Sequence, residues 1–101
     1  MKTTIVRYKV KADRAEENKA FIRKVFEELA DSQPGGLRYA SFNLDDGVSF
    51  VHIAMIDTSD GSNPLSETAA FKAFVAEIKD RCEEPPAATP AEPIGSYGFG
   101  F

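Results

Sequence analysis

The sequence predicts an α+β fold in which helices cover an antiparallel sheet of four strands. Two observations support this prediction. Stretches with apolar residues at every second position alternate with stretches where they recur at helical spacing, in the order β-α-β-β-α-β. The chain also has only 101 residues, the length of a single domain. We therefore expect residues 1–101 to form one domain.

The first strand and the first helix follow from adjoining patterns. Residues 3–11 alternate between a face that carries Arg7 and Lys9 and an apolar or aromatic face. Asp13 then suits a helix N-cap, and apolar residues recur at helical spacing over residues 14–31. The motif Pro34-Gly35-Gly36 ends this run, so we predict the helix between these limits.

A hairpin is predicted next, from residues 37–44 and 48–56. Its strands are joined by Asp45-Asp46-Gly47, because Asp and Gly tolerate the backbone angles of tight turns. After a polar loop, Asn63-Pro64 resembles an N-cap and the first residue of a second helix. We expect that helix to continue to about residue 83, with Cys82 on its apolar face.

The last part of the chain is predicted as a linker followed by a strand. Residues 84–93 form a Pro-rich linker, and residues 94–101 alternate aromatic residues with small ones, including Tyr97. This alternation predicts a fourth strand with one aromatic face. The glycines do not precede a helix, so they do not predict a phosphate-binding loop.

The third predicted strand, residues 48–56, is apolar on both of its faces. Two helices cover only one face of a ferredoxin-like sheet, and the other face would expose a larger apolar patch than monomers normally carry. We therefore expect this face to pack on the same face of a second chain. The predicted fold class is a ferredoxin-like β-α-β-β-α-β subunit that forms a homodimeric α+β barrel.

The hairpin register decides which side chains accompany His52, the only histidine. A two-residue loop at Asp46-Gly47 places Ser41 opposite His52, whereas a three-residue loop places Ala40 there. We favour the first register because it gathers polar side chains around His52. The residues of that face would be Tyr39, Ser41, Asn43, Phe50, His52 and Ala54. The opposite face, expected to pack on the helices, would be Ala40, Phe42, Leu44, Val51, Ile53 and Met55.

Composition argues against several classes of function. The net charge of −4 and the dispersed Lys and Arg residues do not suit a nucleic-acid partner. No apolar run is long enough for a signal peptide or a membrane span, so we expect a cytoplasmic protein without a membrane partner. Cys82 cannot form an intramolecular disulfide, and Cys82 and His52 are too few ligands for a structural zinc site. We expect no metal or cofactor.

Four stretches together resemble the antibiotic-biosynthesis-monooxygenase-like branch of the dimeric α+β barrel superfamily. They are VRYKVKADRAEENKAF, GGLRYASFNLDDGVSFVHIAMID, NPLSETAAFKAFVAEIKDRCEEPP and IGSYGF, which span nearly the whole chain. The resemblance implies a fold more specifically than a reaction, because the superfamily includes cofactor-independent monooxygenases, quinol oxygenases, haem-degrading enzymes and isomerases. The chain departs from the haem degraders, since it has no Trp and reads PLSET where many relatives carry a histidine.

His52 is the candidate catalytic residue. Histidine titrates near neutral pH, so it suits a general base that acts on a phenolic or enolic substrate, whose carbanion reacts with O₂ without a metal. The alternative is a core histidine that donates to Ser41 or to a backbone carbonyl inside a dimer interface. On the face turned toward the partner sheet, the candidate ligand contacts are Arg7, Tyr39, Ser41, Asn43, Phe50 and Tyr97.

Two function classes follow. The first is a cofactor-independent oxygenase or isomerase of a small aromatic or enolic compound. The second is a non-catalytic dimer that binds a small apolar ligand or has a structural role. The volume of any cavity beside His52 distinguishes them, because a densely packed interior has no room for a ring.

Overall fold

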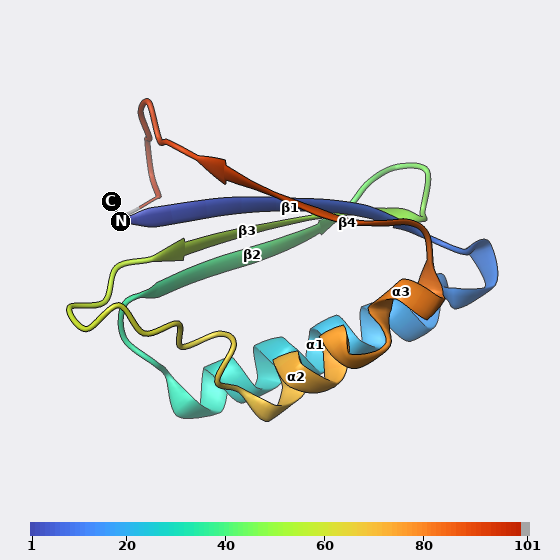
Figure 1. The fold of residues 1–101 in the computed structure, drawn as a ribbon, viewed down its shortest axis with the longest axis horizontal. Helices are drawn as coiled ribbons and strands as arrows, with labels where there is room; N and C mark the ends of the chain where they lie inside the picture. Colours follow the sequence, from blue (N-terminus) through green and yellow to red (C-terminus); the bar gives the residue numbers. More distant parts are fainter. Residues whose placement is uncertain (100–101) are drawn as a thin grey trace.

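The structure, a computed structural model, describes residues 1–99 of the chain. One sheet lies above a layer of helices, and the chain enters the helical layer twice (Figure 1). The elements in chain order are β1 (Lys2–Val10), η1 (Ala12–Arg14), α1 (Ala15–Ser32), β2 (Leu37–Asn43), β3 (Ser49–Ile56), α2 (Ala69–Ala76), α3 (Ile78–Arg81) and β4 (Cys82–Ala91).

The four strands form a single antiparallel sheet in the order β2-β3-β1-β4. The helices α1, α2 and α3 all lie on one face of this sheet (Figure 1). The prediction of a ferredoxin-like α+β arrangement is therefore confirmed. The central strands are β3 and β1, which carry the residues of the site described below.

The fourth strand is not where the sequence placed it. β4 covers Cys82–Ala91 and pairs with β1, with Ile5 opposite Thr89, so the predicted linker at 84–93 is mostly strand. The prolines of this segment led to the prediction of a linker, because proline has no N–H to donate to a neighbouring strand. Proline is tolerated where no such bond is needed, as on the outer side of an edge strand. The predicted strand at 94–101 is wrong for residues 94–99, which are not strand; residues 100–101 lie outside the described part.

The second helix is shorter than predicted and is broken in two. The side chain of Asn63 accepts hydrogen bonds from the backbone N–H groups of Leu65 and Ser66, which belong to a turn and not to a helix. The N-cap of α2 is instead Thr68, whose Oγ1 accepts from Phe71 N at 3.2 Å. The helix ends at Glu77, where φ is −131°, and Cys82 starts β4.

The predicted hairpin register is confirmed. Ser41 lies opposite His52 in the β2–β3 pairing. The loop is longer than two residues, because β2 ends at Asn43, β3 begins at Ser49, and Gly47 N bonds to Leu44 O at 3.0 Å within the loop. Gly47 adopts a φ of +79°, which glycine permits without strain, and the longer loop leaves the pairing of the strands unchanged.

The assignment of the two sheet faces is wrong. The face that carries His52 packs against the helices, where the buried core includes Tyr8, Phe50 and Phe74. The opposite face is open, and on it Ile5 is 38% exposed and Phe42 50% exposed. The sequence pattern could not decide between the faces because β3 is apolar on both.

Glu28 of α1 fixes the start of α2. Its carboxylate accepts from Ala70 N at 2.8 Å and from Ala69 N at 3.2 Å. These two N–H groups belong to the first turn of α2, where helix N–H groups lack intrahelical partners and a negative charge is favourable. The contact therefore ties the two long helices together at one end.

We predict that Glu28→Ala lowers the free energy of unfolding by about 1–2 kcal/mol, because two helix N–H groups lose a charged acceptor. Urea unfolding followed by circular dichroism measures the loss. Glu27→Ala is the matched control, since Glu27 is exposed one residue away. Equal losses in the two variants would show that the carboxylate of Glu28 does not cap α2.

Candidate functional site

Both ring nitrogens of His52 form hydrogen bonds with side-chain hydroxyls. Nε2 lies 2.8 Å from the hydroxyl of Tyr8, and Nδ1 lies 2.6 Å from the hydroxyl of Tyr39 and 2.8 Å from Oγ of Ser41. The three partners come from β1 and β2, the strands on either side of β3. His52 is only 4% exposed, so these contacts take the place of water.

The hydrogen bonds continue from Tyr8 into the helical layer. Asn18 of α1 donates from Nδ2 to the Tyr8 hydroxyl at 2.9 Å. Arg81, at the end of α3, donates from Nε to Oδ1 of Asn18 at 3.2 Å. The polar chain thus runs from α3 through α1 and β1 to His52, and both Asn18 and Arg81 are almost completely buried.

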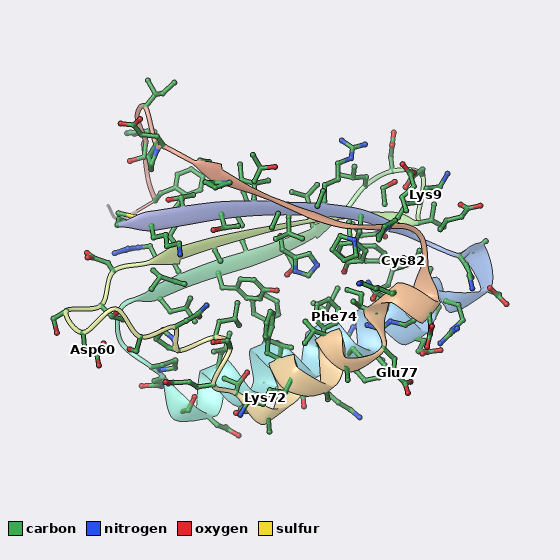
Figure 2. The ribbon with its side chains drawn as sticks, in the orientation of Figure 1. Lys9, Asp60, Lys72, Phe74, Glu77 and Cys82 are labelled. Atoms are coloured by element: carbon green, nitrogen blue, oxygen red, sulfur yellow. The ribbon has the colours of Figure 1, made fainter. Side chains whose placement is uncertain are left out.

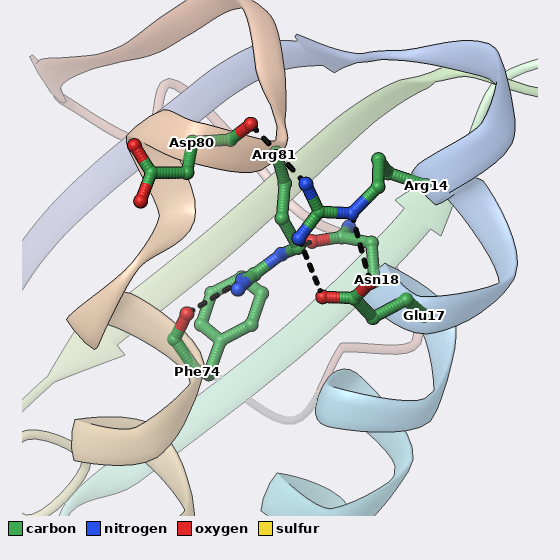
Figure 3. A network of polar contacts seen from close by, with 6 residues as sticks. All are labelled: Arg14, Glu17, Asn18, Phe74, Asp80 and Arg81. Carbon is green, nitrogen blue, oxygen red and sulfur yellow. Dashed lines mark hydrogen bonds and ion pairs between the residues drawn. The ribbon is translucent and has the colours of Figure 1, made fainter.

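The guanidinium of Arg81 is a buried cation that forms none of the recorded ion pairs. Figure 3 shows it between Asn18 and the backbone carbonyl of Phe74, which accepts from an Nη2 hydrogen at 2.6 Å. Its carbon Cζ also lies 4.5 Å from the ring centre of Phe21, a favourable cation–π distance. Nearby, Arg14 pairs with Glu17 and reaches the carbonyl of Asp80.

A cavity of about 410 Å³ opens between the sheet and the helices, beside this polar chain. Figure 2 shows Phe74 of α2 pointing from the helical layer toward the sheet. Tyr8, Tyr39 and His52 provide the polar wall of the cavity. Its other lining residues are largely apolar and include Val6, Ala54, Leu65, Phe71, Phe74 and Ile78.

Burial shifts the pKa values of the polar wall. Desolvation lowers the pKa of His52 from 6.5 to about 4, so the ring is neutral at pH 7. Desolvation also raises the pKa of Tyr8 well above its usual range, although the hydrogen bond from Asn18 acts in the opposite direction. The pKa of Tyr39 is raised by burial too, against a hydrogen bond from Ser41. All three side chains are therefore uncharged near neutral pH.

The predicted site residues fall into two groups. Tyr39 and Ser41 contact His52, and Phe50 stacks on Tyr8 with ring centres 5.5 Å apart. Asn43 donates to the carbonyl of Ser49 near the turn and does not contact His52 in the described structure.

Arg7 and Tyr97 do not belong to the face of His52, and their placement there was wrong. Arg7 precedes Tyr8 on β1, so its side chain points to the open face, away from the helices. Tyr97 follows β4 and is 96% exposed. Its misplacement comes from the misassigned fourth strand.

Sequence reasoning missed Tyr8, Asn18 and Arg81. A signal for Asn18 was present, because it follows Ala15 by three residues and precedes Val25 by seven, so it lies in the buried stripe of α1. Arg81 likewise follows Ile78 by three residues. A polar residue inside an apolar helical stripe indicates a buried partner, and here the partner of Asn18 is Tyr8.

In residues 1–99 no three His, Cys, Asp or Glu side chains are grouped so that they could hold a metal ion. None of the helices in the same range combines the length and the apolar character needed to span a bilayer.

The low pKa of His52 predicts a pH dependence of stability. Because the pKa in the folded chain, about 4, lies below the ordinary value of 6.5, the unfolded chain binds a proton first as pH falls. Stability from this group is complete above pH 6.5 and decreases by about 3 kcal/mol as pH approaches 4. In His52→Gln this part of the decrease should be absent, as urea unfolding at pH 7 and pH 4.5 can measure. If the free energy of unfolding decreased equally with pH in the two proteins, the low pKa of His52 would be contradicted.

No family model matches this sequence, and no curated protein sequence matches it. Solved structures do match the fold. A proposed antibiotic biosynthesis monooxygenase from Nitrosomonas europaea has a TM-score of 0.78 at 25% identity, over 94% of this chain and 100% of that one. Rv0793 from Mycobacterium tuberculosis has a TM-score of 0.75 at 16% identity, over 94% and 96% of the two chains.

A third similar structure is SnoaB, a cofactor-independent oxygenase from Streptomyces nogalater. Its TM-score is 0.69 at 14% identity, over 96% of each chain. The likeness therefore extends over more than nine-tenths of this chain. The predicted resemblance is confirmed at the level of structure: this chain has the fold of the antibiotic-biosynthesis-monooxygenase-like proteins.

Proposed function

We propose that this chain binds a small aromatic or enolic compound in the cavity between the sheet and the helices. The observation that carries the proposal is the cavity of about 410 Å³ beside His52, which is within the size range of small-molecule sites. Apolar side chains suit a ring, and Tyr39 and His52 suit its oxygen. The expected alternative of a densely packed interior does not fit this volume.

The reaction proposed for the bound compound is oxygenation by O₂ without a cofactor, and isomerisation is the related possibility for an enolic compound. The likeness to SnoaB, which is described as a cofactor-independent oxygenase, supports this class. His52 is the proposed catalytic residue because it lines the cavity and is neutral at pH 7. A largely apolar cavity strengthens hydrogen bonds to a developing negative charge on the compound.

A second candidate function is binding without catalysis. It is favoured by the hydrogen bonds of His52, whose two nitrogens both have partners within the protein. A ring held in this way cannot take a proton from a ligand unless Tyr8, Tyr39 or Ser41 first releases a nitrogen. O₂ consumption in the presence of a bound compound separates the two candidates.

We also propose that the functional unit is a cytoplasmic homodimer. The support is the open face of the sheet, where Ile5 and Phe42 are exposed and Val51, Ile53 and Met55 lie on the same side. Apolar faces of this kind are normally covered. A second copy would place two such faces together and form the α+β barrel.

Filling the cavity should abolish binding of a ring. We predict that 1-naphthol binds to the wild type and that Ala54→Leu weakens its binding at least tenfold, because Ala54 lines the cavity and the larger side chain occupies the space of the ring. Isothermal titration calorimetry measures both affinities. Ala20→Leu, on the exposed face of α1, should leave the affinity unchanged. Wild-type protein that binds no naphthol, or equal binding by both variants, would contradict the proposed site.

Light scattering tests the dimer. At micromolar concentration the wild type should have twice the mass of one 11.1 kDa chain, and Phe42→Asp should shift it toward the monomer, because a carboxylate would be buried without a partner. Ala20→Asp adds the same charge at an exposed position of α1, which lies on the other face of the sheet, and should leave the mass unchanged. A wild-type mass of a single chain would refute the dimer.

A further inference from the structure

We propose that Arg81 and Asn18 are positioning residues that fix the direction of the hydrogen-bond chain through Tyr8 and His52. In this direction every member donates toward the cavity, and the chain ends with the Tyr39 hydroxyl donating into it. The ligand oxygen at this point is then an acceptor, such as a ketone, an enolate or a phenolate. The last step rests on the proposed ligand site, whereas the direction of the chain does not.

The direction follows from Arg81, because a guanidinium has hydrogen-bond donors and no acceptor. Its Nε therefore requires the carbonyl oxygen of Asn18, which lies 3.2 Å away. This contact settles the orientation of the Asn18 amide, whose Nδ2 then faces the Tyr8 hydroxyl at 2.9 Å. An amide nitrogen can only donate, so the oxygen of Tyr8 accepts.

The hydroxyl of Tyr8 must in turn donate to His52. It has a single hydrogen, and its remaining recorded partner is Nε2 of His52 at 2.8 Å. Nε2 is therefore the unprotonated nitrogen of the neutral ring, and Nδ1 carries the hydrogen. Nδ1 then donates to the oxygens of Tyr39 at 2.6 Å and Ser41 at 2.8 Å.

Tyr39 is the point at which the chain meets the cavity. Its oxygen accepts from Nδ1 of His52 at 2.6 Å. The hydrogen of the Tyr39 hydroxyl is then available to a ligand, because Tyr39 lines the cavity. Hydrogen bonds that point the same way polarise one another, so the buried cation at Arg81 strengthens the final donor. A donor placed in this way stabilises negative charge on a ligand oxygen.

Asn18→Asp should reverse the chain. The carboxylate would accept from both Arg81 and Tyr8 and would keep the shape of the asparagine side chain. Tyr8 would then donate to residue 18 and accept from His52, so the ring hydrogen would move from Nδ1 to Nε2. Long-range ¹H–¹⁵N correlation spectra of the imidazole report this directly, because His52 is the only histidine.

At pH 7 we expect the wild type to show a protonated Nδ1 and Asn18→Asp to show a protonated Nε2. Ala20→Asp, which adds the same charge at an exposed position of α1 outside the hydrogen-bond chain, should keep the wild-type pattern. A wild-type ring protonated on Nε2 would overturn the proposal without any variant. An unchanged tautomer in Asn18→Asp that retains the wild-type amide spectrum would also overturn it.

The ligand step has its own probes, 1-tetralone and 1-naphthol. The ketone can only accept a hydrogen bond, whereas the naphthol can also donate one. We expect Asn18→Asp to weaken 1-tetralone binding about fivefold relative to 1-naphthol binding, the effect of one neutral hydrogen bond. Equal changes for the two probes would overturn the proposed acceptor preference. Wild-type protein that binds neither probe would refute the ligand site. The tautomer of His52 would still test the direction of the hydrogen-bond chain independently.

Discussion

The structure depends on one buried cation, Arg81, which forms no ion pair with a carboxylate in residues 1–99. Arg81 is 1% exposed, and removing a guanidinium from water is costly unless its donors are satisfied. Here the carbonyl of Phe74, the amide of Asn18 and the ring of Phe21 meet that need. Because these groups come from α1 and α2, the cation also holds the helical layer together at the end where β4 begins.

The same cation explains why so much polarity is buried beneath the sheet. The side chain that accepts a hydrogen bond from Arg81 also carries a donor, and this donor needs an acceptor of its own. Asn18 therefore donates to Tyr8, and Tyr8 donates to His52. The hydrogen bonds end at Tyr39 and Ser41, beside the cavity. A core made only of apolar side chains would be easier to bury, so this chain of hydrogen bonds is best understood as part of a site.

The two faces of the sheet have different roles. The helix side carries the polar chain and the cavity. None of the helices in residues 1–99 lies on the other side (Figure 1), where Ile5 and Phe42 are exposed. Residues that alternate along one strand therefore serve two purposes, because neighbours such as Val51 and His52 point in opposite directions.

Much of this could be predicted from the sequence, and the failures have physical causes. Local periodicity located β1, α1 and the hairpin, and the pairing of Ser41 with His52 was predicted because it gathers polar side chains on one face. β4 was missed because prolines oppose a central strand but are tolerated at an edge. The face of the sheet that packs on the helices was predicted wrongly because β3 has apolar residues on both sides.

The candidate site was only half predictable for a related reason. Tyr39 and Ser41 reach His52 from the adjoining strand of the hairpin, and hairpin pairing is a short-range property of the chain. Tyr8, Asn18 and Arg81 reach the site from β1, α1 and α3, and their positions depend on how these elements pack. The polar character of Asn18 and Arg81 within buried helical stripes was visible in the sequence. The contacts that link Arg81 to Asn18, Asn18 to Tyr8 and Tyr8 to His52 were not.

Neutron diffraction from deuterium-exchanged crystals of the wild type at pH 7 would locate the hydrogens of the chain from Arg81 to Tyr39. We expect deuterium on Nδ1 of His52 and none on Nε2, with the Tyr8 deuterium directed at Nε2. Deuterium on Nε2, with the Tyr8 hydroxyl directed elsewhere, would show that Arg81 does not set the direction of the chain.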